Sequence, residues 1–320
     1  MLEAQELQVR YPLRGSREDL LAVDGVSLAV AAGESVGLVG ESGCGKSSVA
    51  QALVGLIEPS GGRVLFRGAD LWRAGRGARR QFRRQVQMVF QDPCGSLNPR
   101  LSVGSALREA LQVGGREADP GAVAELLRSV GLEPEHGARY PHELSGGQRQ
   151  RVGIARALAV GPALLIADEP VSALDVSVQI QILNLLRALR RERGLAYLLI
   201  AHDLAVVRYL CERVLVMYLG RIVESGPAER LFAQPAHPYT EALLSAVPDV
   251  ERGLRARRGG SRRIVLRGDA AAGAARTAGC PFHPRCHRAA DVCRSVPPPV
   301  VNVAAGHASA CHFAGRWAAA

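Results

Sequence analysis

Lysine is nearly absent from this sequence. Of the 40 basic residues among 320, only Lys46 is a lysine and the other 39 are arginines. A formal net charge of +10 could mark a surface for nucleic acid or for an anionic membrane. Because arginine replaces lysine everywhere else, a compositional bias is the simpler interpretation of that charge. The one exception, Lys46, therefore calls for a chemical explanation.

Long apolar runs are also missing. No segment approaches the ~18 to 20 consecutive apolar residues that a membrane-spanning helix needs, because candidates such as AYLLIAHDLAVV are interrupted by charge. The first residues, MLEAQELQVRYP, have an acidic start and no apolar core, so they do not predict a secretory signal. With 48% apolar residues the chain can bury a globular core. We expect a cytosolic protein that does not cross a membrane by itself.

Strand and helix patterns alternate along most of the chain. The stretch ESVGLVG (34–40) predicts a buried strand that runs into a glycine loop and then into a helix. Further strands are predicted at VQMVF, ALLIAD, LAYLLIA and RVLVMYL, with helical patterns between the last three. Such alternation predicts a parallel sheet with helices on both faces. Successive helical patterns from about 102 to 158 predict a helical insert.

The lone lysine lies in GESGCGKS, a stretch that fits the phosphate-binding motif G-x-x-x-x-G-K-[ST], or Walker A motif. Its glycines let the backbone N–H groups point inward, and the start of the following helix adds the positive end of its dipole. Lys46 can then reach the β- and γ-phosphates, while Ser47 binds Mg²⁺. The predicted ATP-binding residues of the loop are Gly40, Glu41, Ser42, Gly43, Cys44, Gly45, Lys46, Ser47 and Ser48.

The second half of such a site is an acidic pair at the end of an apolar strand. LLIADE supplies Asp168 and Glu169. We expect Asp168 to hold Mg²⁺, directly or through water, and Glu169 to accept a proton from the attacking water. A DE pair at a strand end is common, so its place after the phosphate loop is what favours this interpretation.

The stretch LSGGQ, Leu144 to Gln148, resembles the signature of ATP-binding cassette (ABC) ATPases. Other pieces follow that family's order. By this resemblance, Tyr11 stacks on adenine, Gln91 meets Mg²⁺ and the attacking water, and His202 contacts the γ-phosphate. The resemblance implies the ABC cassette of the P-loop NTPases, an α/β fold with a mainly parallel sheet, an antiparallel β part and a helical insert.

The signature also implies a partner subunit. Serine and glycines that open a helix aim a hydroxyl, N–H groups and a dipole at an anion, and in the resembled family that anion is the γ-phosphate of ATP on the other subunit. Since each motif occurs once here, two cassettes must close head to tail. The residues implied at this seam are Ser145, Gly146, Gly147 and Gln148 of the signature, and Asp175 of the SALD loop that crosses to the partner.

Finer wording resembles the ATPase subunits of bacterial oligopeptide and dipeptide importers, notably HPYTEALLSAVP and EPVSALDVSVQIQILNLL. The latter is closer to the second of their two unequal ATPases, which favours a heterodimer over a homodimer. Departures from the family pattern occur at Cys94 and at Cys211-Glu212. The resemblance implies a peripheral subunit on the cytoplasmic face of the membrane, with two permeases and an extracytoplasmic substrate-binding protein as further partners.

Two other functions stay open. The importer could carry another solute, such as nickel, glutathione, haem or a sugar, since the substrate never touches the ATPase. A soluble ABC protein acting on ribosomes or nucleic acid would suit the positive charge. Such proteins usually carry two cassettes or a long coiled-coil insertion, and this chain shows neither, so we expect no nucleic-acid partner.

Cysteines crowd the carboxyl-terminal part. Disulfides are not expected in a reducing compartment, and the absence of any C-x₂-C pair fits zinc ligation poorly, whereas four thiolates suit an iron–sulfur cluster. Some members of the resembled family carry a [4Fe–4S] cluster there, so we infer one. Zinc, with the nearby histidines His283, His287, His307 and His312, and free thiols remain alternatives. The candidate ligands are Cys280, Cys286, Cys293 and Cys311.

The predicted organisation has three parts. Residues 1–248 form the ABC ATPase domain, with a helical subdomain at about 92–158. A linker rich in Arg, Gly and Ala covers 249–278, and the Cys-rich segment covers 279–320. We expect a segment this short to be folded by its metal.

Overall fold

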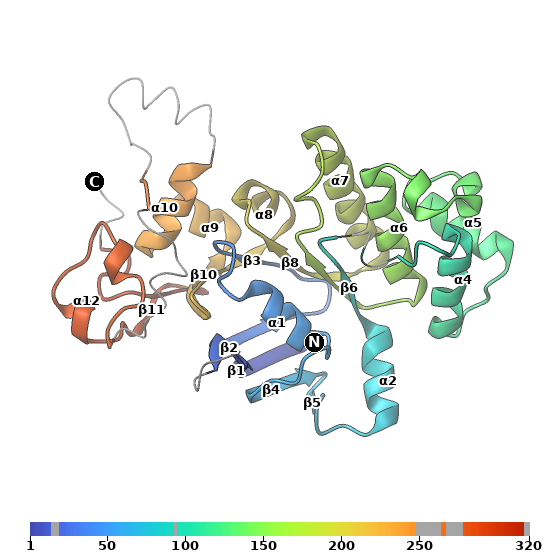
Figure 1. The fold of residues 1–320 in the computed structure, drawn as a ribbon. Coiled ribbons are helices and arrows are strands. Elements are labelled where there is room, and N and C mark those ends of the chain that lie inside the picture. The colour runs from blue at the N-terminus through green and yellow to red at the C-terminus, as the bar shows by residue number, and fades with distance from the viewer. Residues whose placement is uncertain (14–18, 93–94, 96, 248–263, 267–277, 317–320) are drawn as a thin grey trace.

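The computed structural model describes residues 1–13, 19–92, 95, 97–247, 264–266 and 278–316. Most of the predicted linker, and Cys94, lie outside the described residues. Within them the chain forms one eight-stranded sheet and one four-stranded sheet, with helices around both (Figure 1). No helix of this described part is long and apolar enough to pass through a bilayer.

The larger sheet has the strand order β11-β12-β10-β9-β3-β8-β7-β6. Its parallel part runs from β9 to β6, and every residue of β3, β7 and β8 is buried, as expected for strands covered on both faces. Beyond β9 the pairing becomes antiparallel. The strands are β3 (Ser35–Val39), β6 (Val86–Val89), β7 (Leu164–Asp168), β8 (Ala196–Ala201), β9 (Arg213–Tyr218), β10 (Arg221–Pro227), β11 (Val300–Ala304) and β12 (His307–Ala310).

The smaller sheet is antiparallel and has the order β2-β1-β4-β5. It comprises β1 (Leu2–Tyr11), β2 (Leu20–Val30), β4 (Gly61–Phe66) and β5 (Ala69–Asp70). Helix α1 (Lys46–Leu53) packs between this sheet and the parallel strands, since its buried Val49 and Leu53 share one core with Leu7 and Ile166. The antiparallel part that the sequence predicts is thereby confirmed.

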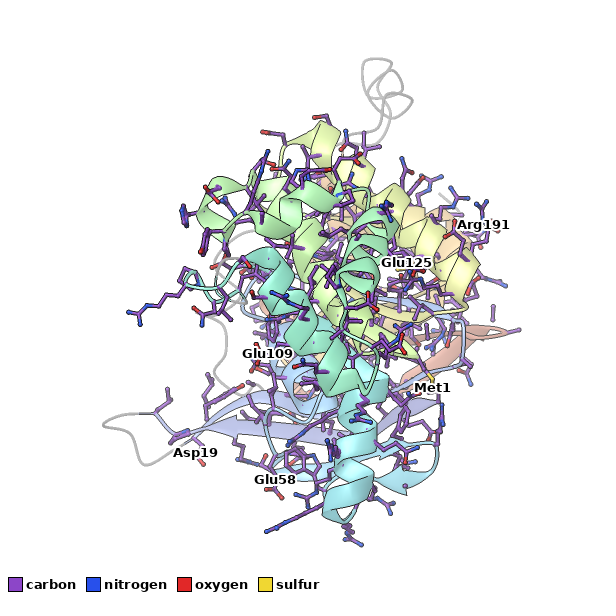
Figure 2. All side chains as sticks on the ribbon, turned by 90° about the vertical axis from the view of Figure 1, so that its right-hand side faces the viewer. Met1, Asp19, Glu58, Glu109, Glu125 and Arg191 are labelled. Carbon is purple, nitrogen blue, oxygen red and sulfur yellow. The ribbon has the colours of Figure 1, made fainter. Side chains whose placement is uncertain are left out.

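The helical insert forms one end of the molecule, shown in Figure 1 and turned toward the viewer in Figure 2. It contains α4 (Val103–Gly114), α5 (Pro120–Ser129), α6 (Gly146–Ala159) and two short 3₁₀ helices, η1 (Pro134–Ala138) and η2 (Pro141–Glu143). The side chains of Ser102, Asp119 and Ser145 cap the three α-helices by accepting backbone N–H groups. These helices lie where the sequence predicts them.

The remaining helices flank the two sheets. They are α2 (Arg76–Gln85), α7 (Val176–Arg193), α8 (Leu204–Leu210), α9 (Ala228–Ala233), α10 (Pro238–Ala246), α12 (Val292–Ser295) and the 3₁₀ helix η4 (His283–Arg285).

The carboxyl-terminal segment continues the cassette's main sheet. Strand β12 pairs with β10, and β11 closes that edge. Phe282 of this segment is 1% exposed and packs edge-on against Tyr218, with ring centroids 5.2 Å apart. His307 and Glu224 meet across the junction, both buried, with Nε2 and Oε1 2.7 Å apart. The segment thus shares the core of the cassette, whereas we expected it to be folded by its metal alone. The limits of the three predicted domains stay a prediction.

Candidate functional site

The predicted phosphate loop links β3 to α1. A Cβ added to Gly45, whose φ is +105°, would lie 2.3 Å from the carbonyl oxygen of Ala22, so only glycine fits there. Lys46 begins α1 and is 5% exposed. Its Nζ donates hydrogen bonds to the carbonyl oxygens of Gly40 and Glu41, at 2.8 and 2.9 Å. The lone lysine thus places its ammonium inside the loop.

Asp168 ends strand β7 beside this loop and is 5% exposed. A hydrogen bond from Ser47 lowers the pKa of Asp168, but burial, the larger effect, raises it above the usual range. Its Oδ1 is buried and has no hydrogen-bond partner among the described residues. A buried carboxylate oxygen without a partner is costly, and a cation would satisfy it. The pair of Ser47 and Asp168 therefore fits the oxygen ligands that Mg²⁺ prefers.

Two predicted residues, Gln91 and His202, converge on one carboxylate oxygen of a third, Glu169. Nε2 of Gln91, which follows β6, donates to Oε2 of Glu169 at 3.2 Å. Nδ1 of His202, which follows β8, lies 3.2 Å from the same oxygen. Each of the three residues follows a parallel strand, so their side chains meet at the carboxyl ends of neighbouring strands. Gln91 therefore bonds to the predicted base, Glu169.

Glu169 itself has an uncommon backbone. Its φ is +45°, a left-handed value that costs free energy for a residue with a Cβ. The backbone N–H of Glu169 donates to the carbonyl of Ile200 at 2.9 Å, which fixes this conformation against β8. The strained turn points the carboxylate at Gln91 and His202.

Tyr11 lies at the end of β1 and reaches the same region. Its hydroxyl donates to Oγ of Ser48 at 3.1 Å, so the ring stands beside the first turn of α1. The geometry places Tyr11 at the loop; its stacking on adenine stays a prediction.

The signature residues open α6. Oγ of Ser145 accepts the backbone N–H of Gln148 at 3.3 Å, and Oε1 of Gln148 accepts the backbone N–H of Ser145 at 2.9 Å, which is a capping box. A Cβ on Gly147 would lie 2.5 Å from Cγ1 of Val178 in α7, and Asp175 precedes that helix. The signature and the SALD loop therefore adjoin, and Gly146 and Gly147 let them approach closely.

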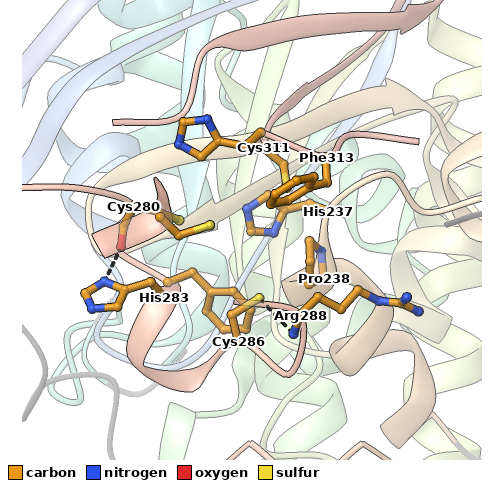
Figure 3. A pocket seen from close by; sticks show the side chains of 11 residues that line it. His237, Pro238, Cys280, His283, Cys286, Arg288, Cys311 and Phe313 are labelled. Atoms are coloured by element: carbon orange, nitrogen blue, oxygen red, sulfur yellow. Dashed lines mark hydrogen bonds between the residues drawn. The ribbon is translucent and has the colours of Figure 1, made fainter. Parts of the chain in front are cut away.

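The four carboxyl-terminal cysteines line a single cavity, together with His237, His283 and His312 (Figure 3). Burial raises the pKa of Cys286 and of Cys311 to about 11. The described His, Cys, Asp and Glu side chains form no group of three or more with the geometry of a metal-ion site.

Two of the four histidines that we considered for zinc lie elsewhere. His287 lies against Glu241, with Nε2 and Oε2 3.1 Å apart, and His307 pairs with the buried Glu224. Only His283 and His312 of that set reach the cavity of the cysteines.

Two residues that contact the phosphate loop escaped the sequence analysis. The hydroxyl of Tyr239 accepts the backbone N–H of Glu41 at 2.8 Å, and the guanidinium of Arg285 binds the Glu41 carboxylate. Tyr239 lies in the HPYTEALLSAVP stretch, which we used only for its family resemblance. No local pattern singles out Arg285 among 39 arginines.

Comparisons with known proteins show the family of the chain. A family model described as "ABC transporter" matches residues 23–172, and one described as "Oligopeptide/dipeptide transporter, C-terminal region" matches residues 223–293. The probable peptide ABC transporter ATP-binding protein y4tS of Sinorhizobium fredii is 49% identical, over 100% of this chain and 92% of that protein. The chain belongs to the ABC transporter ATP-binding proteins.

Other relatives of this ABC family include the oligopeptide transport ATP-binding protein AppF of Bacillus subtilis, 45% identical over 98% of this chain and 97% of that protein. Among solved structures, a dimeric post-hydrolysis state of the ATP-binding cassette MJ0796, bound to ADP and Pi, has a TM-score of 0.65 and 30% identity. That match covers 71% of this chain and 99% of the other. The predicted cassette fold is confirmed, and the chain is an ABC ATPase.

Proposed function

We propose that this chain hydrolyses ATP to drive the import of oligopeptides or dipeptides through partner permeases. The observation that carries the ATPase part is the convergence of Gln91 and His202 on Glu169, next to Asp168 and the phosphate loop. Two observations support the peptide part. The chain matches relatives that are named as peptide and oligopeptide transport proteins, along nearly their whole length, and residues 223–293 match the oligopeptide/dipeptide transporter family model.

The residues divide the chemistry among themselves. Lys46, whose ammonium lies inside the loop, would neutralise the β- and γ-phosphates. Ser47 and Asp168, with Gln91, would hold Mg²⁺, which supplies charge neutralisation at the phosphate oxygens. Glu169 would accept the proton of the attacking water, while the Gln91 amide and the His202 ring orient its carboxylate. The strained backbone of Glu169 keeps that base in position.

A complete site would need a second cassette. Ser145 and Gln148 cap the start of α6 and use each other's backbone N–H groups, so the N–H groups of Gly146 and Gly147 between them would be offered to a γ-phosphate from a partner subunit. Asp175, in the adjoining loop, would cross the same seam. We propose a head-to-tail pair with a related, unequal ATPase, peripheral on the cytoplasmic face of the membrane, served by two permeases and an extracytoplasmic binding protein.

For the cysteine cavity we propose a [4Fe–4S] cluster held by Cys280, Cys286, Cys293 and Cys311. Support comes from four thiols lining one cavity. Burial raises the pKa of the Cys280, Cys286 and Cys311 thiols, so binding of the cluster would have to displace their protons. When bound, the cluster would connect these four cysteines and so stabilise the fold of the carboxyl-terminal segment.

Anaerobic purification tests this cluster. We expect about four irons per chain and a broad brown absorption band, both lost in Cys286→Ser. Stoichiometric zinc in place of iron, or metal-free protein, would contradict the cluster while leaving the ATPase proposal intact.

The decisive experiment for the transport function is co-purification of the chain with candidate permeases, followed by an ATPase assay in membranes. We expect a binding protein loaded with peptide to stimulate hydrolysis. Stimulation by nickel, glutathione, haem or sugar ligands, but not by peptides, would redirect the substrate assignment. Salt-sensitive binding to nucleic acid without any associated permease would overturn the transport function.

A further inference from the structure

The carboxyl-terminal segment grips the phosphate loop through Arg285. Its Nη1 donates to Oε2 of Glu41 at 2.6 Å, and its Nη2 donates to Oε1 at 2.9 Å. The Arg285 side chain is 9% exposed and that of Glu41 is 27% exposed. A two-point pair between guanidinium and carboxylate fixes orientation as well as distance. The contact ties the second residue of the loop to a segment 244 positions away.

A second anchor holds the backbone of the same residue. The hydroxyl of Tyr239 accepts the N–H of Glu41 at 2.8 Å. The Tyr239 ring is fully buried, with its centroid 4.8 Å from that of Tyr218 and 5.4 Å from that of Phe282. Because Phe282 belongs to the carboxyl-terminal segment, docking of the segment fixes this anchor too.

From within the loop, Lys46 grips the same stretch of backbone. Its ammonium binds the carbonyl oxygens of Gly40 and Glu41. The start of the loop is thus held on one side by Lys46 and on the other by Tyr239 and Arg285. A loop that is ordered before ligand arrives loses less conformational entropy on binding.

The position of Arg285 depends in turn on the cysteine-lined cavity. Arg285 is the last residue of the 3₁₀ helix η4. The backbone N–H of its first residue, His283, donates to the carbonyl oxygen of Cys280 at 3.1 Å, and the N–H of Cys286 donates to the carbonyl oxygen of His283 at 3.3 Å. Backbone hydrogen bonds therefore connect the turn that carries Arg285 to Cys280 and Cys286, two of the four cysteines of the cavity.

We propose that Arg285 is a positioning residue for the ATPase: the carboxyl-terminal segment, through Arg285 and Glu41, pre-orders the phosphate loop and so supports nucleotide binding. The proposal rests on the ATP site described above and adds to it a support outside the cassette motifs. Arg285 acts through Glu41, so its loss affects the affinity for ATP more than the rate of hydrolysis at saturating ATP.

The test is a titration of the full-length chain with a fluorescent ATP analogue. For Arg285→Ala we expect an affinity about tenfold weaker, which corresponds to ~1.4 kcal/mol, while kcat at saturating ATP in the assembled transporter stays within about twofold. Arg285→Lys, which keeps the charge but loses the fork, should recover part of the affinity. In a double-mutant cycle, Glu41→Gln combined with Arg285→Ala should be no weaker than Arg285→Ala alone.

Arg288→Ala is the matched control. Arg288 also bridges the segment to the cassette, since its Nη2 lies 2.9 Å from Oε1 of Glu241 on α10, but Glu241 lies outside the phosphate loop. We expect this variant to bind the analogue as the wild type does. Equal weakening in both variants would show that Arg285 only docks the segment, and unchanged affinity in Arg285→Ala would overturn the proposal.

Hydrogen exchange keeps the test informative if affinity falls through misfolding. We expect faster exchange of the amides of residues 40–45 in Arg285→Ala, with unchanged exchange in the helical insert. Faster exchange throughout the chain, or unchanged exchange in residues 40–45, would contradict the proposal that Arg285 positions the phosphate loop. A wild-type chain that binds no ATP would instead overturn the proposed function.

Discussion

Nδ1 of His202 and Nε2 of Gln91 both lie 3.2 Å from one oxygen, Oε2 of Glu169. Two side chains from different strand ends therefore fix a single carboxylate, whose own backbone is held at a φ of +45°. A general base must be held within reach of the proton that it removes, and this arrangement limits the rotation of the Glu169 side chain.

The role of Glu169 is tested by Glu169→Gln. The amide keeps the size of the carboxylate but cannot accept the proton, so we expect ATP hydrolysis to fall roughly 10² to 10⁴-fold while ATP binding persists. Single-turnover hydrolysis and nucleotide titration separate the two effects. Turnover near that of the wild type would remove Glu169 from the role of base.

Lys46→Arg tests why the one lysine is retained. The buried ammonium fits between two carbonyl oxygens, at 2.8 and 2.9 Å, and a planar guanidinium needs more room. We expect ATP binding or hydrolysis to be lost. Arg80→Lys, on the exposed face of α2, is the control and should leave activity unchanged; an active Lys46→Arg would show that charge alone is required.

Ser145→Arg tests the dimer seam. The long cation would fill the anion site at the start of α6, so we expect ATPase activity of the assembled transporter to be lost while the chain's own loop still binds ATP. Ser145→Ala loses the cap, at a cost of about 1 kcal/mol in stability, together with the hydroxyl proposed to face the γ-phosphate, so we expect its ATPase activity to lie between those of the wild type and Ser145→Arg. Normal hydrolysis by an assembled pair in which both subunits carry the arginine would argue against the head-to-tail arrangement.

Phe282→Ala tests the docking of the carboxyl-terminal segment. This ring is 1% exposed and contacts Tyr218 and Tyr239, so we expect the free energy of unfolding to fall by about 3 to 5 kcal/mol. Chemical denaturation measures the change. Val300→Ala, at a side chain 73% exposed, should have little effect. An equal loss in the two variants would mean that the aromatic cluster contributes nothing specific.

Much of the fold could be predicted from local patterns. The continuous apolar run ending in Asp168 correctly indicates a buried parallel strand, because apolar periodicity is a local property. The glycine loop before Lys46 is likewise a local motif, and the phosphate site that it predicts stays a prediction. The family motifs also identified Gln91 and His202, although their meeting at Glu169 depends on the strand order of the sheet. The Mg²⁺ ligands and the contact of Tyr11 with adenine are still predictions.

The support behind the loop could not be predicted in this way. The pairing of Arg285 with Glu41 joins residues 244 apart, and a charge in an arginine-rich tail carries no local sign of its partner. Strands β11 and β12 were missed for a similar reason: they are short, and their place in the sheet is set by the long-range pairing of Ser309 with Glu224.

The pairing of β12 with β10 determines whether the protein can be truncated before its carboxyl-terminal segment. A chain ending at residue 248 would leave β10 as an open edge, with unpaired backbone groups ready to join another chain. It would also uncover Tyr239 and strip Glu224, whose side chain is fully buried, of its partner His307. We therefore expect the isolated cassette to self-associate, so expression work should retain the tail.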